Sequence, residues 1–503
     1  MDIFTATIII SIVIYIAIGN YAGRGIKQLD DYYVAGRRAP TLLIVGTLVA
    51  SVMSSTMFMG EAGFTYDGQM GPFLQFPQIA TDGYNFGALF LGRYLRRNRA
   101  STVAEYFGRR FDSHHVQMAA GLTIIVALGG YLIVVTQGAA ILLSDLTRLS
   151  YTESLIIAWL SYTAFTMYSG SRGVILTDTI MFLLFTISSF FVAAYLVDTF
   201  GGLAATIEGL AAQSDKPGIA SWHGIVGPGT EWPTAMDYLI WTLIIDLGWG
   251  FSYAVSPWQS SRHLMARNEH VVIRAAIYTC LAVAFVQLVG YGAGGFVNLA
   301  KTDIEPSETV LIWASKNMVP EFLGALLLAG IMAAALSSAS TFLSLVGFSA
   351  SNDIVKQKQR ADKQAIKVSR FVMLGVGVVA LFVTFVFPPS LFWVTYFIGT
   401  VFASSWGPVG LMSIWSKRIT KDGAFWGIIS GFLFNAVPWL LDFTGFIELP
   451  SYLNPILLGA LVSLLSRSQF RVGALSVKQN VLIATNCTAR RRKNWTRRKR
   501  RAR

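Results

Sequence analysis

Cysteine, histidine and charged residues are all scarce in this chain of 503 residues. The two cysteines, Cys280 and Cys487, support neither a disulfide framework nor a thiolate metal cluster. The five histidines are scattered and show no metal-ligand spacing. Charged residues make up only 13% of the chain, whereas soluble domains carry about 25%. These absences exclude a disulfide-rich secreted fold, a zinc-dependent fold and an ordinary soluble enzyme.

Long apolar segments make up much of the chain, since 54% of its residues are hydrophobic. The segments reach about 18–29 residues, the length that crosses the hydrocarbon core of a bilayer. Short alternating segments, typical of a transmembrane barrel, are absent from the sequence. The start, Met1 to Phe4, has neither a basic region nor a small-residue cleavage site, so we expect the first segment to be a retained helix. The sequence predicts an all-α polytopic membrane protein.

Thirteen spans are predicted, and the charges of their loops orient them. The spans cover residues 4–22, 41–61, 72–94, 117–145, 151–169, 174–199, 237–256, 271–299, 322–350, 368–388, 391–414, 423–442 and 451–466. Lys and Arg gather in the loops after spans 1, 3, 7, 9 and 11 and are few or absent in the others. Since positive loops stay in the cytoplasm, the N-terminus is predicted outside, the C-terminus in the cytoplasm, and the protein in the plasma (inner) membrane.

The same pattern predicts the organisation of the chain. Spans 2 and 7 are both interrupted by glycine and lie five spans apart, the spacing of the first helices of two inverted five-helix repeats. The predicted parts are an N-terminal helix and cytoplasmic loop (1–40), a first repeat (41–199), an extracellular loop with short surface helices (200–236), a second repeat (237–415), two C-terminal helices (416–470) and a basic tail (471–503).

The tail accounts for most of the net charge of +13, because eleven Lys and Arg and no acid follow from Lys478 onward. Such a segment can bind anionic lipid at about 1 kcal/mol per basic residue. Its composition differs so sharply from the rest that a lost reading frame after about residue 470 is the alternative interpretation. The cytoplasmic position of the basic loops accounts for their charge, so no nucleic-acid partner is expected.

Four acids lie within or next to apolar segments, namely Glu61, Asp82, Asp178 and Asp246. Each costs about 2.5–3.5 kcal/mol at the centre of a bilayer, so each is expected to face the bundle interior or a cavity. Glu61 and Asp82 could instead lie at the membrane interface, and Asp178 could be a carboxylate at a helix N-terminus. Two glycines follow Asp246, and they predict a bend or a broken helix there.

A run of hydroxyls is the strongest polar feature inside a span. Five of the eight residues from Ser337 to Ser344 carry a hydroxyl, inside the uncharged segment 322–350. On a helix, Ser337, Ser338, Ser340, Thr341 and Ser344 fall within an arc of roughly 160°. Two interpretations are open, a packing seam of small residues or a face turned to something polar. Span 2 is similarly rich in small and hydroxyl residues around 46–56. It can unwind if a cation or water meets its freed carbonyls.

Four motifs, in order and at the right spans, resemble the sodium:solute symporter family. They are Leu29–Arg38 after span 1, Thr102–Phe111 after span 3, Pro257–Arg262 with Met265–Arg267 after span 7, and Ser416–Ala424 after span 11. The likeness extends to about residue 470. It implies a LeuT-like inverted-repeat fold, sodium as the coupling ion, a small-molecule solute as the partner, and no other cofactor or metal. We expect the protein to function as a monomer.

The resemblance also implies site residues. Its main sodium site falls here on the carbonyls of Ala50 and Met53 and on an Ala-x-x-Ser-Ser motif, Ala334, Ser337 and Ser338. Some members bind a second sodium, for which this chain has Asp178, Ser340 and Thr341, with Ser337 shared. Ser344 is assigned to packing.

The candidate solute pocket comprises Thr56, Met57, Asp246, Trp249 and Tyr253. Trp249 and Tyr253 stand eight and four residues before Pro257, as in proline-type members. Val52 stands where proline transporters carry an aspartate. This departure weakens a proline assignment, and Thr56 and Met57 argue against a sugar.

The sequence therefore predicts a sodium-coupled symporter that imports an amino acid or an organic acid, such as proline, pantothenate or acetate, by alternating access. Two alternatives stay open at this point, a proton-coupled symporter of the same fold and a transporter-like membrane sensor. No nucleophile–base pair, metal cluster or phosphate loop in the sequence favours an enzyme.

Overall fold

The computed structural model describes residues 2–75, 77–230, 232–354, 361–387, 391–450 and 453–466. All regular secondary structure within these residues is helical, apart from one isolated bridge between Ala39 and Ala266. The predicted basic tail, 471–503, and Cys487 lie outside the described residues. The all-α prediction is confirmed for the part of the chain that the structure describes.

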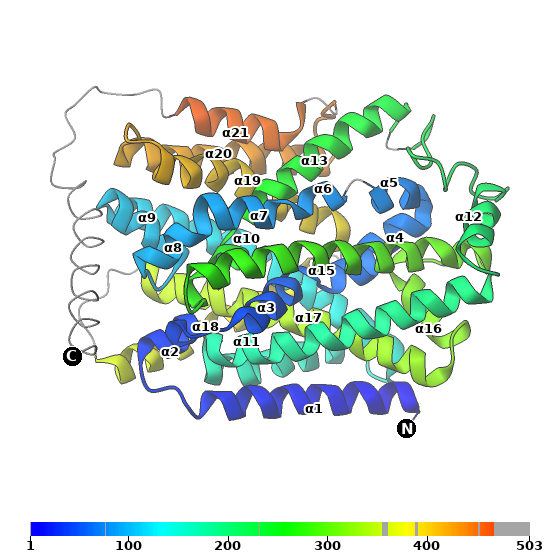
Figure 1. The fold of residues 1–503 in the computed structure, drawn as a ribbon, viewed down its shortest axis with the longest axis horizontal. Coiled ribbons are helices and arrows are strands. Elements are labelled where there is room, and N and C mark those ends of the chain that lie inside the picture. Colours follow the sequence, from blue (N-terminus) through cyan, green and yellow to red (C-terminus); the bar gives the residue numbers. More distant parts are fainter. Residues whose placement is uncertain are drawn as a thin grey trace, which may run out of the picture. The chain divides into compact units, whose positions relative to one another are not determined.

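The helices follow one another along the chain as Figure 1 shows. The first half contains α1 (Ile3–Gly23), α2 (Leu29–Val34), α3 (Thr41–Val52), α4 (Ala62–Phe64), α5 (Met70–Gln75), α6 (Pro77–Thr81), α7 (Gly83–Gly87), α8 (Arg93–Asn98), α9 (Val103–Phe111), α10 (His114–Leu146) and α11 (Tyr151–Thr199). The second half contains α12 (Leu203–Ala211), α13 (Ala235–Val255), α14 (Pro257–Met265), α15 (Glu269–Phe296), α16 (Val310–Asn317), α17 (Glu321–Ser349), α18 (Asp362–Val386), α19 (Leu391–Trp415), α20 (Lys421–Phe443) and α21 (Pro455–Leu465).

Polar side chains mark where many of these helices begin. The side chains of Thr102, Ser113, Ser150, Thr234 and Asn268 each accept a hydrogen bond from the backbone N–H three residues later. Such caps satisfy N–H groups that have no partner inside the helix. The loops that carry these caps therefore fix the ends of the spans.

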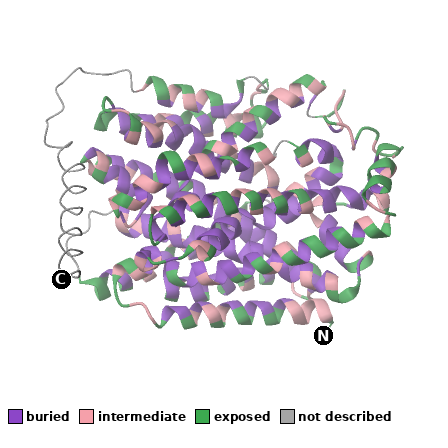
Figure 2. Ribbon diagram, viewed as in Figure 1, coloured by how far each residue is buried: buried purple, intermediate pink, exposed green. Residues whose placement is uncertain are grey.

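Helix α17 lies at the centre of the bundle. In its most apolar window 83% of the residues are buried, compared with 22% in α1. It packs against α10, α11, α1 and α3, and Figure 2 shows the buried residues concentrated in the middle of the bundle, whereas α1 lies at its edge. Its Gly, Ala and Ser residues allow neighbouring backbones to approach closely, which drives helix packing in lipid. The predicted hydroxyl run is thus in the interior.

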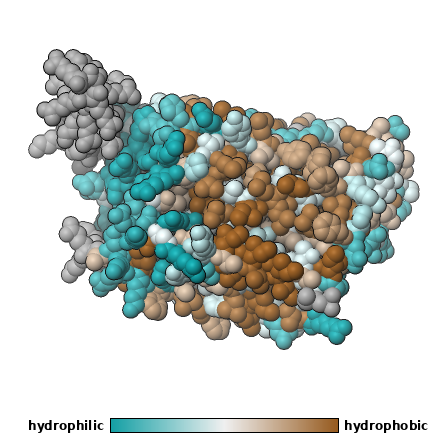
Figure 3. Space-filling view, turned by 60° about the horizontal axis from the view of Figure 1, so that its bottom comes forward, coloured by the Kyte–Doolittle hydropathy of each residue, from teal (hydrophilic) through white to brown (hydrophobic). Residues whose placement is uncertain are grey.

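A hydrophobic band crosses the outer surface between hydrophilic ends (Figure 3). In the described part of the chain, nine helices are long and apolar enough to cross a membrane, and a bent pair makes a tenth span. Within the described residues, the predicted span 72–94 is divided into the short helices α5 to α8, and the helix in the predicted span 451–466, α21, has only 11 residues. The predicted spans 151–169 and 174–199 are joined in α11, which is broken at Gly170 (φ 51°). A Cβ at Gly170 would lie 2.6 Å from the carbonyl oxygen of Tyr32.

Span 2 is broken, as predicted, but it is longer than predicted. Helix α3 ends at Val52, and Met53 has an extended backbone (ψ 101°). A second helical stretch runs from Thr56 to Gln75 at 56° to α3. The predicted end of span 2 at residue 61 is therefore wrong, and so is the loop predicted between residues 61 and 72. The residues between the predicted spans, 62–71, are mostly buried against protein, where their backbone forms helical turns.

The break predicted near Asp246 is also misplaced. Helix α13 continues through Gly248 and Gly250, and the chain leaves the helix at Ser256 (ψ 147°), before Pro257 begins α14. Gly250 serves close packing instead, because its carbonyl oxygen lies 2.0 Å from where a Cβ at Gly83 would stand. Proline, which cannot donate to the preceding turn, ends this helix, whereas the glycines do not.

The contact between α7 and α13 gives a testable consequence. Replacing Gly83 with Ala places a methyl group against the α13 backbone, so we expect the free energy of unfolding to fall by about 1–3 kcal/mol. Gly129→Ala in α10 is the matched control, since no atom lies within 4 Å of a Cβ there. Thermal unfolding of the purified protein in detergent measures both. Equal stability of the two variants would contradict the close contact.

Candidate functional site

The hydroxyls of α17 meet the broken end of α3. The Ser337 hydroxyl donates to the carbonyl oxygen of Ala50 at 2.7 Å and to that of Ala334 at 3.0 Å. The Ser338 hydroxyl lies 3.4 Å from the carbonyl oxygens of both Ala50 and Met53. All five residues are buried. The structure thus brings together the whole set that the sequence assigned to the main sodium site.

The spacing of these oxygens suits a hard cation. Oxygens that lie about 2.4 Å from a shared hard cation are about 2.8–3.4 Å from their neighbours. The oxygen pairs above are 2.7–3.4 Å apart. Three carbonyls and two hydroxyls offer neutral oxygen ligands, without a fixed charge of their own. Such a cluster is chemically fit to hold a monovalent cation.

Asp178 belongs to a separate cluster of charged and hydroxyl side chains. Its Oδ2 accepts a hydrogen bond from the Thr47 hydroxyl at 2.6 Å and lies 3.6 Å from Nη2 of Arg262. The guanidinium also donates to the hydroxyls of Thr47 and Thr341. The carboxylate and the guanidinium are both buried. Arg262 therefore joins two of the residues assigned to a second sodium.

The remaining hydroxyls of the run bond to their own helix. The Ser340 hydroxyl donates to the carbonyl of Ser337, and the Ser344 hydroxyl donates to the carbonyl of Thr341, each at 2.8 Å. Ser344 therefore has the packing role expected of it. Within the described residues, the Ser340 hydroxyl makes no hydrogen bond to Asp178.

A cavity lies beside the break in α3. Its walls include Val52, Met53, Met57 and Glu61 from the broken span, and further residues from α13, α15 and α19. Met57, Asp246, Trp249 and Tyr253 line it, as the sequence predicted. Thr56 is not among its lining residues, because its hydroxyl bonds to that of Thr395 at 3.0 Å. The cavity encloses about 720 Å³, including solvent at its mouth.

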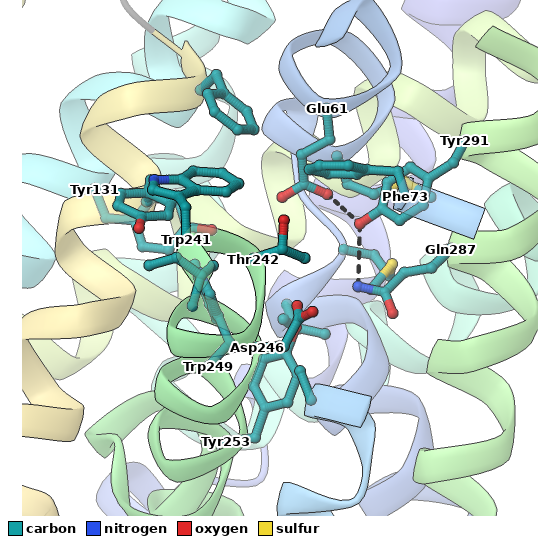
Figure 4. Close-up of a pocket in the computed structure, with 17 residues that line it drawn as sticks. Glu61, Phe73, Tyr131, Trp241, Thr242, Asp246, Trp249, Tyr253, Gln287 and Tyr291 are labelled. Atoms are coloured by element: carbon teal, nitrogen blue, oxygen red, sulfur yellow. Dashed lines mark hydrogen bonds between the residues drawn. The ribbon is translucent and has the colours of Figure 1, made fainter. Parts of the chain in front are cut away.

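Polar groups in this cavity come from several helices (Figure 4). The Tyr291 hydroxyl donates to Glu61 and accepts from the Gln287 amide at 3.1 Å. Asp246 points into the same space from α13. Of the four intramembrane acids, Glu61 and Asp246 thus reach the cavity, Asp178 is paired with Arg262, and Asp82 is exposed.

Several cavity residues were missed from the sequence, including Trp241, Thr242, Gln287, Tyr291 and Tyr396. Arg262 was noted only as part of a motif. Gln287 had a usable signal, since it is a polar group in a largely apolar segment. The aromatic residues had none, because 13% of the chain is aromatic and an aromatic side chain by itself does not indicate a cavity.

Met53 belongs to both sites. Its carbonyl faces the Ser338 hydroxyl, and the residue also lines the cavity. A change in the backbone at the break therefore acts on the oxygen cluster and on the cavity wall together.

The buried pair of Asp178 and Arg262 can be tested by a double-mutant cycle. Asp178→Asn or Arg262→Gln alone leaves a buried charge unpaired, so each is expected to destabilise the protein by about 3–5 kcal/mol. The double variant should lose less than the sum. Glu269→Gln is the control, since it breaks a more exposed ion pair with Arg97 and should cost at most about 1 kcal/mol. Additive losses in denaturation would contradict the pairing.

Known proteins similar to this chain are transporters. The sodium:solute symporter family matches residues 32–431. The sodium/proline symporter of Escherichia coli (strain K12) is 24% identical over 442 residues, which cover 84% of this chain and 85% of that protein. The sodium/pantothenate symporter of the same strain is 24% identical over 474 residues, with coverage of 91% and 93%.

Solved structures share the fold. A Na⁺-coupled sialic acid symporter in a substrate-bound outward-open state has a TM-score of 0.77, with 19% identity, and the match covers 93% of this chain and 97% of that one. Mhp1, a nucleobase-cation-symport-1 family transporter, has a TM-score of 0.56, with 11% identity and coverage of 89% and 97%. The predicted LeuT-like fold is confirmed by these likenesses. Since the family match covers most of the chain, this protein belongs to the sodium:solute symporter family.

Proposed function

We propose that sodium binds among the carbonyl oxygens of Ala50, Met53 and Ala334 and the hydroxyls of Ser337 and Ser338, and drives import of a small organic solute. The observation that carries this proposal is the meeting of Ser337 and Ser338 with the end of α3, across more than 280 residues of sequence. In an unbroken helix the Ala50 carbonyl would bond to the N–H of residue 54. The cation and the hydroxyls of α17 satisfy it instead.

Coupling follows from the shared backbone at Met53. A cation drawn to this cluster ties α3 to α17 and orders the segment that forms one wall of the cavity. The solute then binds to a wall that is already in place, so that each ligand raises the affinity for the other. One charge moving through 100 mV is worth about 2.3 kcal/mol, which corresponds to roughly fifty-fold accumulation of solute.

One sodium per cycle is the stoichiometry that the Arg262 contacts support. The guanidinium already supplies a positive charge between Asp178 and Thr341. A second sodium at Asp178, Ser340 and Thr341 requires Arg262 to withdraw during the cycle. Counting bound ²²Na⁺ per protein distinguishes the two cases.

The proposed orientation in the plasma membrane has the N-terminus outside and the C-terminus in the cytoplasm. The basic helices α8 and α9 lie at the opposite end of the bundle from α12 and α16 (Figure 1). Arg96, Arg97, Arg109 and Arg110 belong to these two helices, and positive residues favour the cytoplasmic side. The oxygen cluster and the cavity are both formed by helices of a single chain, which is compatible with a monomer as the working unit.

Removing either hydroxyl should weaken sodium binding. Ser337→Ala or Ser338→Ala is expected to raise the sodium concentration for half-maximal ²²Na⁺ binding roughly tenfold, since a hydrogen-bonding group facing a charge is worth about 1.5–3 kcal/mol. Ser344→Ala on the same helix is the control, because its hydroxyl bonds only to α17. Unchanged binding in both site variants would remove the cluster from the mechanism.

Replacing external sodium with choline at fixed pH should abolish concentrative uptake. The assay uses proteoliposomes and labelled proline, pantothenate, acetate, pyruvate and sialic acid, with a potassium-diffusion potential held constant. The oxygen cluster is expected to bind sodium better than larger cations. A proton does not require a set of several oxygen ligands. Uptake that is equal in both salts but follows a pH gradient would instead identify proton coupling.

A further inference from the structure

The cavity beside α3 has an unusual charge balance. Among its lining residues, all of which the structure describes, Glu61 and Asp246 are acidic and no lysine, arginine or histidine is present. Asp246 comes from the middle of α13 and is 5% exposed. A buried carboxylate is costly unless an opposite charge or hydrogen bonds compensate for it. The cavity therefore holds two carboxyl groups for which its lining residues supply no cationic partner.

Three buried polar atoms in this cavity have no hydrogen-bond partner in the described part of the chain. They are Oδ2 of Asp246, Oε1 of Gln287 and Oγ1 of Thr242. Two of the three atoms are acceptors only, and the third is a hydroxyl that can also accept. Buried polar groups are nearly always paired, so a ligand or water that donates hydrogen bonds here would satisfy all three atoms.

Aromatic rings enclose the same space. Trp241 stacks on Tyr396, with centroids 5.4 Å apart and planes at 6°. Trp249 and Tyr253 are 5.6 Å apart on the next turns of α13, and all four side chains line the cavity. The faces of such rings attract cations, most strongly where water is excluded.

We propose that the solute is a small organic cation, a protonated amine whose N–H groups bind Asp246 and whose charge is held by Glu61 and the surrounding aromatic faces. The inference rests on the proposed function, because it assigns the substrate class of that same cavity. An amino acid fits through its ammonium group. A simple organic acid such as acetate does not fit, since its only charge repeats that of the two carboxylates.

The test compares each amine with an isostere that lacks the charge. Isothermal titration calorimetry on the full-length protein in nanodiscs uses pyrrolidine, benzylamine, putrescine and L-proline. Their partners, which lack the ammonium charge, are tetrahydrofuran, benzyl alcohol, 1,4-butanediol and cyclopentanecarboxylate. We expect at least one amine to bind about 30-fold more tightly than its partner, the lower end of the loss when a buried charge pair loses one member. Equal binding within every pair, or no binding by any amine, would overturn the inference.

Asp246→Asn tests the assigned contact, because it keeps the shape of the side chain and removes its charge. It should weaken amine binding about 30-fold and leave binding of the three uncharged partners unaffected. Asp237→Asn is the control on the same helix, since Asp237 pairs with the Thr234 cap and does not line the cavity. A variant that shifts sodium affinity but preserves the amine-to-isostere ratio would show that Asp246 serves sodium, and would also overturn the inference.

The two proposals fail in different ways. All titrations are repeated with potassium chloride in place of sodium chloride. Amine selectivity that is equally strong in both salts supports the inference and contradicts sodium coupling. Sodium-dependent binding without discrimination between amine and isostere supports the proposed function and contradicts the inference.

Discussion

The whole arrangement depends on how the carbonyls at the end of α3 are satisfied. A helix that ends inside the membrane leaves its last carbonyls without N–H partners, and lipid offers none. Here the hydroxyls of Ser337 and Ser338 on α17 approach those of Ala50 and Met53. The break is tolerated because it lies between buried helices. It also creates the cluster of neutral oxygens on which the proposed sodium coupling rests.

The second consequence of the break is the cavity wall. The stretch after Thr56 leaves α3 at 56°, which turns Met57 and Glu61 toward α13 and α15. Opposite them, α13 contributes Asp246 and the aromatic side chains. Glu61 and Asp246 line this cavity, whereas Asp178 does not and is paired with Arg262.

Much of this could be predicted from the sequence, for identifiable physical reasons. The hydroxyl run and the small residues around Ala50 are local patterns, and in hydrocarbon such polar groups have few possible roles. The family motifs indicated that the two segments form one site. The prediction of a break near Asp246 was wrong because glycine also allows close contact between helices, as Gly250 does against Gly83. Arg262 and Trp241 gain their roles only from contacts between distant helices, which no local pattern encodes. The solute class likewise depends on which side chains share one cavity.

The central claim is that sodium orders the broken segment that the two sites share. Hydrogen–deuterium exchange of the full-length protein in nanodiscs measures this directly, at peptides covering residues 50–60 and 334–341, in sodium and in potassium at equal ionic strength. The account predicts slower exchange in both peptides with sodium and no change in α20, which lies away from the cluster. Identical exchange in the two salts at residues 50–60 would contradict it.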